Sequence, residues 1–179
     1  DDRRSDTVEG GSVQDRTYAK ESLILCDFLY PIIWTTEDGG HVGDPSIESQ
    51  IYSAVTGRET DEKELNLIGE RIFNLQRAIR LKEGWKARQG DTILDAFFEI
   101  PLPPVRFNEE CLVPGPNGTP VSMQGSVVDR QKFEEMKSEY YQLRGWDVNT
   151  GLPTHTKLHE LKLDDIASDL AGRGLLVKQ

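Results

Sequence analysis

The sequence predicts an all-α, multihelical fold that contains one long irregular connector, and three observations lead to this prediction. Apolar residues recur at the three- and four-residue spacing of one helix face in several segments, while no segment alternates as a half-buried strand does. Glycine and proline bound these segments where helices start and stop. Residues 101–128 are too rich in proline and glycine to be regular.

The N-terminal segment, residues 1–14, has only Val8 and Val13 as sizeable apolar side chains. Burial of so little apolar surface cannot offset the entropy lost on ordering, so we expect this segment to be frayed. Asp15 is suited to an N-cap, and a nearly all-apolar, buried helix is predicted from there to about Leu29.

Two helices are predicted in the middle of the chain. Asp44 is expected to cap the first, with Pro45 at its first position, and Gly57 to end it. The strongest helical pattern runs from Thr60 to Gly84. Its apolar residues form a single stripe that we expect to be buried: Leu65, Ile68, Ile72, Leu75 and Ile79.

A short helix is predicted at Ile93 to Phe98, and the irregular connector, residues 101–128, follows it. Long structureless connectors are uncommon inside compact domains. We therefore expect this one to pack along a surface, which another part of a parent protein could supply.

The last part of the chain again reads as helical. Asp129 is expected to cap a helix that Gly145 closes, Thr154 to open a short helix, and Asp164 or Asp165 to open a final one. The first of these carries an apolar stripe at three-four-three spacing: Phe133, Met136, Tyr140 and Leu143. Residues 15–179 are thus interpreted as one helical region.

Composition excludes several classes of partner. The net charge of −10 would repel a phosphate backbone. The basic residues of the central helix alternate with acids and read as an ordinary solvated face: Arg71, Arg77, Arg80 and Lys82. Nucleic acid is therefore not expected as a partner. No apolar run approaches the ~20 residues that cross a bilayer, so no membrane span is expected.

The start of the chain and its two cysteines bear on its setting. The chain starts at Asp1, without an initiating Met or the apolar core of a secretory signal, which suggests a cut-out piece or a processed product. Cys26 and Cys111 are too few for a disulfide framework. A reducing, cytoplasmic localisation fits best.

The residues alone offer no complete active site and identify no catalytic residue. His155 and His159 have the spacing that can bring two imidazoles to one metal, but the acid of an H-E-x-x-H motif is missing, so we interpret them as exposed histidines. Cys26 could supply a thiolate to an iron–sulfur cluster, yet one cysteine cannot hold a cluster alone. Taken without relatives, it reads as a small buried hydrophobe.

Two segments resemble the C-terminal region of the aldehyde:ferredoxin oxidoreductase family. The first is GERIFNLQR at residues 69–77, followed by RLKEG at 80–84. The second is YYQLRGWD at 140–147, followed by TGLPT at 150–154 and LHEL at 158–161. Order and spacing both agree, over roughly residues 15 to 170. The two segments together make the resemblance specific.

In that family a D-x-x-G-L-C motif supplies a pterin contact through its acid and the last cysteine ligand of a [4Fe-4S] cluster; an upstream C-x-x-C-x-x-x-C supplies the other three. The corresponding place here is ESLILC, residues 21–26. Leu25 and Cys26 match the motif. Glu21 is a longer acid than the aspartate, and Ile24 stands where glycine is expected. The resemblance implies cluster ligation by Cys26 and cofactor contact by Glu21 and Leu25, although a β-branched residue does not permit the close backbone approach of glycine.

The resemblance implies a parent enzyme that oxidises aldehydes to carboxylic acids at a tungsten, or molybdenum, bis-pterin centre. Electrons would pass singly through the [4Fe-4S] cluster to ferredoxin or another electron-transfer protein. The expected partners are the N-terminal part of the same enzyme and further copies in a homo-oligomer. The isolated chain is expected to hold no cofactor and to be inactive.

Two other interpretations stay open. The parent could be a relative in the same family that acts as the catalytic subunit of an aromatic acyl-CoA reductase, and the departures at Glu21 and Ile24 leave room for it. Alternatively, the chain could be a non-catalytic helical interaction module whose amphipathic faces dock a partner.

Overall fold

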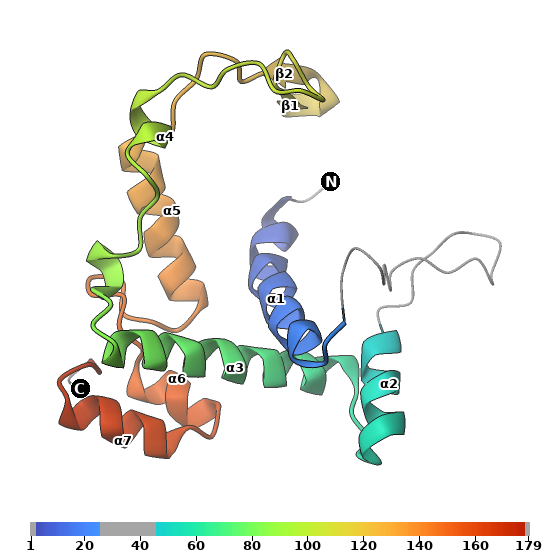
Figure 1. Cartoon of the computed structure of the whole chain (residues 1–179), viewed down its shortest axis with the longest axis vertical. Helices are drawn as coiled ribbons and strands as arrows, with labels where there is room; N and C mark the ends of the chain where they lie inside the picture. Colours follow the sequence, from blue (N-terminus) through green and yellow to red (C-terminus); the bar gives the residue numbers. More distant parts are fainter. Residues whose placement is uncertain (1–2, 26–45, 178–179) are drawn as a thin grey trace.

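A computed structural model of the chain describes residues 3–25 and 46–177, with side chains from Val13 onward (Figure 1). This part of the chain is mostly helical, as predicted, but it also contains a small sheet. In chain order the elements are α1 (Arg3–Ser22), α2 (Ile47–Thr56), α3 (Glu62–Lys82), η1 (Ala87–Gln89), α4 (Ala96–Glu99), β1 (Leu112–Pro114), η2 (Pro116–Gly118), β2 (Pro120–Ser122), α5 (Arg130–Leu143), α6 (His155–Glu160) and α7 (Asp164–Gly172). None of these helices is long and apolar enough to cross a membrane.

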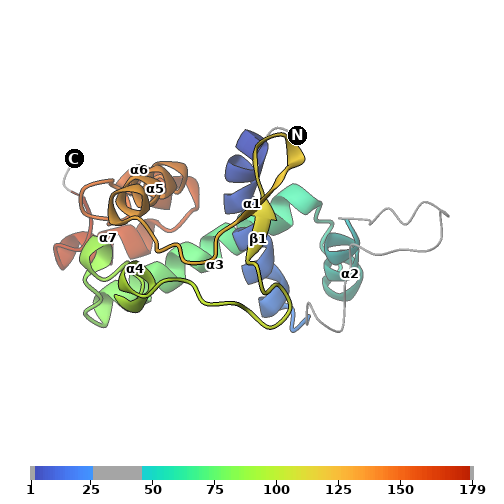
Figure 2. The ribbon, with the colours of Figure 1, turned by 90° about the horizontal axis from the view of Figure 1, so that it is seen from above.

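The long helix α3 is the base on which the other elements stand (Figure 1). Helix α1 crosses the N-terminal half of α3, with α2 beside it, and α7 packs against the other half together with α6. Helix α5 rises from that same end and leads through α4 to the hairpin of β1 and β2, which reaches over the side where α1 stands (Figures 1 and 2). The architecture is open.

The first helix differs from its prediction at both ends. It begins at Arg3, so residues 3–14, expected to be frayed, continue the same helix. Each residue added to an existing helix brings one more hydrogen bond, so a half that is packed on α3 can propagate into a poor sequence. The helix ends at Ser22, before the predicted end at Leu29, which lies outside the described residues along with the predicted Asp44 cap.

Most of the later helix boundaries agree with prediction. The carboxylate of Asp129 accepts a hydrogen bond from the N–H of Lys132, and the hydroxyl of Thr154 accepts one from Lys157. Gly145 has a φ of +65°, which suits a residue that ends a helix. Two starts are shifted: Asp61 rather than Thr60 caps α3, and the short helix predicted at Ile93 begins only at Ala96.

The crossing of α1 over α3 depends on a glycine. A Cβ atom built on Gly69 would lie 1.9 Å from the carbonyl oxygen of Asp15 and 3.2 Å from the amide nitrogen of Ala19. Both are backbone atoms of α1, so no side-chain rotation could relieve the clash. The two backbones therefore touch at Gly69, and only a residue without a side chain fits there.

The buried faces of α3 and α5 are not the predicted apolar stripes. On α3, Leu65 is buried as expected, but Leu75 and Ile79 are exposed. On α5, Met136 and Leu143 are likewise exposed. Both helices instead bury polar or charged side chains, which on α3 lie beside Leu65, Ala78 and Leu81: Asn74, Arg77, Lys137 and Tyr141. The prediction was wrong because a polar network, not an apolar seam, joins α3 to α5.

Arg77 is the centre of this network, and its assignment to a solvated helix face was wrong. Its guanidinium donates two hydrogen bonds to Asp91, of 2.8 and 2.6 Å, and one of 2.7 Å to the carbonyl oxygen of Gly151. Tyr141 and the indole N–H of Trp85 also donate to Asp91. Such a buried bidentate pair, satisfied by further donors, fixes the geometry of all the segments that meet there.

Asp91 itself is held ionised by these donors. Burial raises the pKa of its carboxyl, but the hydrogen bonds that it accepts outweigh burial and bring the pKa below the ordinary value of 3.8. Its hydrogen bond also raises the pKa of the Tyr141 phenol, after the larger effect of burial. The Tyr141 hydroxyl therefore stays protonated and donates a hydrogen bond to a charged carboxylate.

A second group of polar contacts, which we call the clasp (Gln14, Asp15 and Arg144), joins α1 to the end of α5. Arg144, which is buried, donates to the carboxylate of Asp15 and to the side-chain oxygen of Gln14. Its guanidinium also lies 4.5 Å from the ring centre of Phe73 on α3. Burial raises the pKa of Asp15, and the pair with Arg144 only partly offsets that rise. Three helices thus meet at one arginine.

A separate apolar cluster fixes α6 and α7 on the C-terminal half of α3. Its buried members are Ala78, Leu158, Leu161, Leu163, Ala167, Leu170 and Leu176. The cluster draws on residues from the last third of the chain and only one from α3. The C-terminal segment therefore builds a small hydrophobic core of its own, and α3 covers one side of this core.

The connector, predicted to be irregular, is an ordered element that we call the arm (residues 101–128). Its outward and return segments are joined by hydrogen bonds: Leu102 donates to the carbonyl of Ser126, and Gly125 donates back to Leu102. At its tip β1 and β2 pair antiparallel, with Val113 opposite Val121. The expectation that no strand would form was wrong, because the prolines sit at strand ends and turns, where a missing N–H is tolerated.

The close crossing at Gly69 gives a stability prediction. Gly69→Ala should lower the free energy of unfolding by about 2 kcal/mol or more, because a clash with helix backbone forces α1 away from α3. Gly172→Ala is the matched control, since a Cβ there would have nothing within 4 Å. The control should be neutral or stabilising by up to about 1 kcal/mol. Urea unfolding of both variants measures the difference, and equal effects would contradict the close crossing.

The Arg77–Asp91 pair gives a prediction about pH. Asp91→Asn should cost about 2 kcal/mol at pH 7, because it leaves the buried Arg77 without its counter-charge. The folded pKa of Asp91 lies below its ordinary value of 3.8, so its contribution is present above that value and is lost as the pH falls through the folded pKa. The gap between wild type and variant should therefore shrink below pH 3.8.

Unfolding curves at pH 7 and pH 3 test this, with Asp95→Asn as control. Asp95 pairs with Arg130 in the open, where its side chain is 78% exposed, so the control should change stability by less than about 0.5 kcal/mol. A gap for Asp91→Asn that is the same at both pH values would mean that the carboxylate charge is not what matters.

Candidate functional site

The residues predicted to serve a cofactor lie at the C-terminal end of α1. There the N–H of Leu25 donates to the carbonyl of Lys20 at 3.1 Å, and the N–H of Ile24 donates to that of Glu21 at 3.0 Å. This pair of bonds is the Schellman arrangement, which normally has glycine in the left-handed conformation at its turning point. Ile24 occupies that point with a φ of +61°.

Glu21 and Leu25 are therefore brought to one end of the same helix. The side chain of Glu21 is exposed, and Leu25 is half-buried. The neighbouring residues of the last turns, Ala19 and Lys20, are the ones that are buried. Cys26 follows directly after Leu25 but lies outside the described residues, so its ligand role stays a prediction.

Helix α1 is anchored on rigid elements just before this end. The Tyr18 hydroxyl donates to the side chain of Gln76, and its ring lies 5.0 Å from that of Phe73. Two residues earlier, Arg16 donates two hydrogen bonds to the buried carboxylate of Glu48 on α2. A chain segment held on two helices in this way can present a following residue at a defined position.

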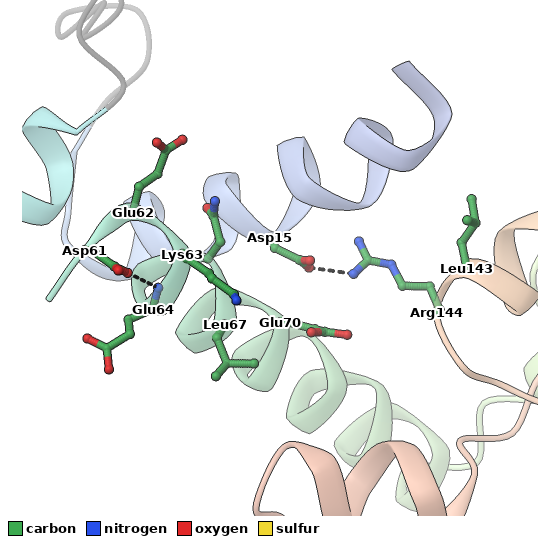
Figure 3. Close-up of a pocket in the computed structure, with 10 residues that line it drawn as sticks. Asp15, Asp61, Glu62, Lys63, Glu64, Leu67, Glu70, Leu143 and Arg144 are labelled. Atoms are coloured by element: carbon green, nitrogen blue, oxygen red, sulfur yellow. Dashed lines mark hydrogen bonds and ion pairs between the residues drawn. The ribbon is translucent and has the colours of Figure 1, made fainter. Parts of the chain in front are cut away.

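An acidic hollow lies beside the clasp between α1 and α5, with a volume of about 730 Å³ (Figure 3). The carboxylates around it come from both helices that cross: Asp15, Asp61, Glu62, Glu64 and Glu70. Arg144 and Lys63 are the basic residues of its lining. Figure 3 shows Asp15 and Arg144 pointing toward one another, so the innermost carboxylate is already paired. Asp61 caps α3, and Glu62 and Glu64 lie in its first turn, where the helix dipole favours a negative charge.

A second hollow, of about 610 Å³, lies where α1, α3 and α5 approach the loop before α4. Its lining includes seven aromatic side chains among polar and charged ones: Tyr18, Phe73, Trp85, Phe133, Tyr140, Tyr141 and Trp146. The Nε atom of Arg77, which lines it, is buried without a hydrogen-bond partner. Both terminal nitrogens of that guanidinium donate to Asp91, and Nη2 also donates to the carbonyl oxygen of Gly151.

The two candidate histidines lie together on α6. Their ring centres are 6.4 Å apart, and Nδ1 of His159 is 2.6 Å from a carboxylate oxygen of Asp164. That bond raises the pKa of His159, which is fully exposed. Within residues 3–25 and 46–177, no group of three His, Cys, Asp or Glu side chains could hold a metal ion. A complete ligand set would therefore need residues from outside the described part.

Several residues of the two segments that carry the resemblance have structural roles in this fold. Gly69 permits the helix crossing, Asn74 accepts a 2.9 Å hydrogen bond from Trp146, and Gly151 accepts one from Arg77. Two further residues of these segments, Arg144 and Arg77, pair with Asp15 and Asp91. Sequence reasoning missed both acids as partners. Asp15 was read only as a cap, and Asp91 lies in a loop, where no periodicity marks a buried side chain.

Comparisons with known proteins agree with these motifs. Residues 11–163 match the family model of aldehyde ferredoxin oxidoreductase, domains 2 and 3. The chain is 33% identical over 117 residues to a tungsten-containing aldehyde ferredoxin oxidoreductase of Pyrococcus horikoshii, which covers 65% of this chain. It is 33% identical over 111 residues to the protein of the same name from Pyrococcus furiosus, covering 62%. The chain spans only 16% and 15% of these two relatives.

Among solved structures, the fold is similar to a chain of the active-site complex BamBC of benzoyl coenzyme A reductase, solved with 1,5-dienoyl-CoA. The TM-score is 0.51 at 21% identity, over 75% of this chain and 16% of that chain. At this identity the likeness shows a shared fold and nothing of the chemistry. Both kinds of relative are several times longer than the matched part, so this chain corresponds to one portion of each of them. On the match over residues 11–163, the chain belongs to the aldehyde ferredoxin oxidoreductase family.

Proposed function

We propose that this chain is the C-terminal helical region of a tungsten-pterin, iron–sulfur oxidoreductase that oxidises aldehydes to carboxylic acids and passes the electrons to ferredoxin. The family match over residues 11–163 carries the proposal, because it includes the end of α1 where the cofactor-binding motif of the family falls. The whole activity belongs to the longer polypeptide, and the isolated chain is expected to be inactive.

In this proposal the end of α1 holds the thiolate of Cys26 for a [4Fe-4S] cluster. The anchoring of Tyr18 and Arg16 on α3 and α2 supports it, since a ligand on a rigid element needs little reorganisation to bind. When bound, the cluster supplies one-electron transfer between the pterin centre and the external acceptor. The other cluster ligands would come from the remainder of the enzyme.

Glu21 is proposed to contact the pterin. Its carboxylate is exposed in the last turn of α1, where the carbonyl groups of the helix end disfavour a negative charge. An N–H donor from a ligand would compensate that unfavourable position. Leu25, half-buried one turn later, would pack against the same cofactor.

The alternative is a relative of the same family that reduces an aromatic acyl-CoA. The fold shared with the benzoyl coenzyme A reductase chain and the departures at Glu21 and Ile24 favour keeping it. Substrate assays of the full-length protein with aldehydes and with aromatic acyl-CoA thioesters separate the two. A non-catalytic helical module is disfavoured, because the named relatives are enzymes.

The ligand role of Cys26 is tested in the full-length protein by Cys26→Ala, with Cys111→Ala as the matched control. Cys111 is buried in the arm, where its thiol lies 3.3 Å from the carbonyl of Pro103. We expect the first variant to lose iron and the paramagnetic resonance signal of the reduced cluster while it stays folded. The second should keep both. A cluster that is unchanged in Cys26→Ala would overturn the assignment.

Ile24 gives a prediction about stability. Ile24→Gly should raise the free energy of unfolding by about 1 kcal/mol, because glycine adopts a φ of +61° without the strain that a β-branched residue suffers there. Ile24→Ala is the control, and it should gain less, since alanine keeps a Cβ. Urea unfolding measures both. If Ile24→Gly is destabilising, the helix end does not have the left-handed turn described above.

A further inference from the structure

We propose that the groove between the arm and α5 is the docking surface for an apolar segment of the remainder of the same polypeptide. This inference rests on the proposed role of the chain as one region of a larger enzyme and adds the surface through which it joins the rest. The groove has a volume of about 740 Å³ and lies along one side of α4, the arm and the first turns of α5.

The lining of the groove is apolar and accessible. Phe97, Ile100, Met123, Val127 and Met136 each contribute, and all of them are exposed. The charged residues of the lining include Asp129 and Lys132, one of each sign, at the edge formed by α5. An exposed lining that is mostly apolar favours contact with another apolar surface rather than with a charged partner.

The arm holds the groove open as a preformed surface. Val128 donates a hydrogen bond to the carbonyl of Phe97, and Met123 donates one to Cys111, both at 2.9 Å. At its base, the ring of Phe98 meets that of Phe133 edge-on at 5.5 Å, under the guanidinium of Arg130. Two-stranded hairpins are at best marginally stable in water, so an arm built in this way needs a surface to lie on.

The described part of the arm has little cover of its own. Every residue from 101 to 110 is exposed. At the tip, the apolar side chains of Leu112, Val113 and Val121 are exposed as well. Apolar surface of this extent is typical of a contact surface.

The length of the relatives identifies the occupant. The matched part is only about one sixth of each named relative, and the same share of the chain with the similar fold. In such proteins most of the polypeptide is available to cover the groove, and the contact is within one chain. A second copy of the chain is the competing occupant, and the experiment below separates the two.

The two methionines of the chain, Met123 and Met136, both line the groove and serve as native probes. Their exposed fractions of 40% and 59% would slow oxidation by hydrogen peroxide only about twofold relative to unfolded protein. In the full-length enzyme, folded against guanidinium-unfolded, we expect both to be protected by on the order of tenfold or more. Twofold protection or less in the full-length enzyme would overturn the proposal.

Photo-crosslinking identifies the occupant. A diazirine methionine analogue incorporated into the full-length enzyme should link positions 123 and 136 to residues upstream of Asp1, and the links should stay within one isotope label when heavy and light chains are mixed. Links between heavy and light chains would mean that a second copy fills the groove, which also overturns the proposal.

A charge in the groove tests the same contact through stability. In the full-length enzyme, Val127→Asp should lower the Tm by about 5 °C or more, because it buries an unpaired carboxylate. Val55→Asp on α2 is the control, since that residue lies outside the groove and is highly exposed, and its Tm should change little. Equal shifts would contradict the proposal. Protected methionines in an enzyme whose Cys26→Ala variant keeps its cluster would leave this surface standing while the redox assignment falls.

Discussion

The backbone contact at Gly69 is the constraint on which the rest of the described structure depends. Because α1 and α3 touch there without intervening side chains, the residues on either side of the crossing are brought within reach of α5. Asp15 then meets Arg144, which also lies over the ring of Phe73. A wider crossing would separate this acid from its partner, so one missing Cβ determines whether the charged clasp can form.

The polar network is the second determinant of the architecture, and it explains what the sequence could and could not predict. Helix positions and several caps followed from spacing and residue type, as for Asp129 and Thr154. The faces did not, because an apolar stripe is expected to be buried only when the chain supplies its own partner surface. Here Leu75 and Met136 are exposed, while Arg77 is buried through its pair with Asp91. Periodicity carries no information about such long-range pairs.

The candidate site shows the same division. A local motif could identify the end of α1, since Glu21 and Leu25 need only the helix that carries them. The left-handed turn at Ile24 could not be predicted from the residue type, because isoleucine rarely adopts a positive φ. The family motif has glycine at this position, but we interpreted that glycine as a requirement for close backbone approach, not for a left-handed turn. The positive φ of Ile24 beside the predicted cofactor motif is therefore a finding of the structure alone.

The exposed hairpin at the tip of the arm also has a consequence for biosynthesis. Both of its strands are edge strands with apolar side chains, which are templates for aggregation when they are left unpaired. If the region is the last part of its polypeptide to be made, the surface that receives the arm is already on hand when the hairpin leaves the ribosome. Synthesis from the N-terminus would then limit the time during which the unpaired strands of the hairpin can associate with other chains.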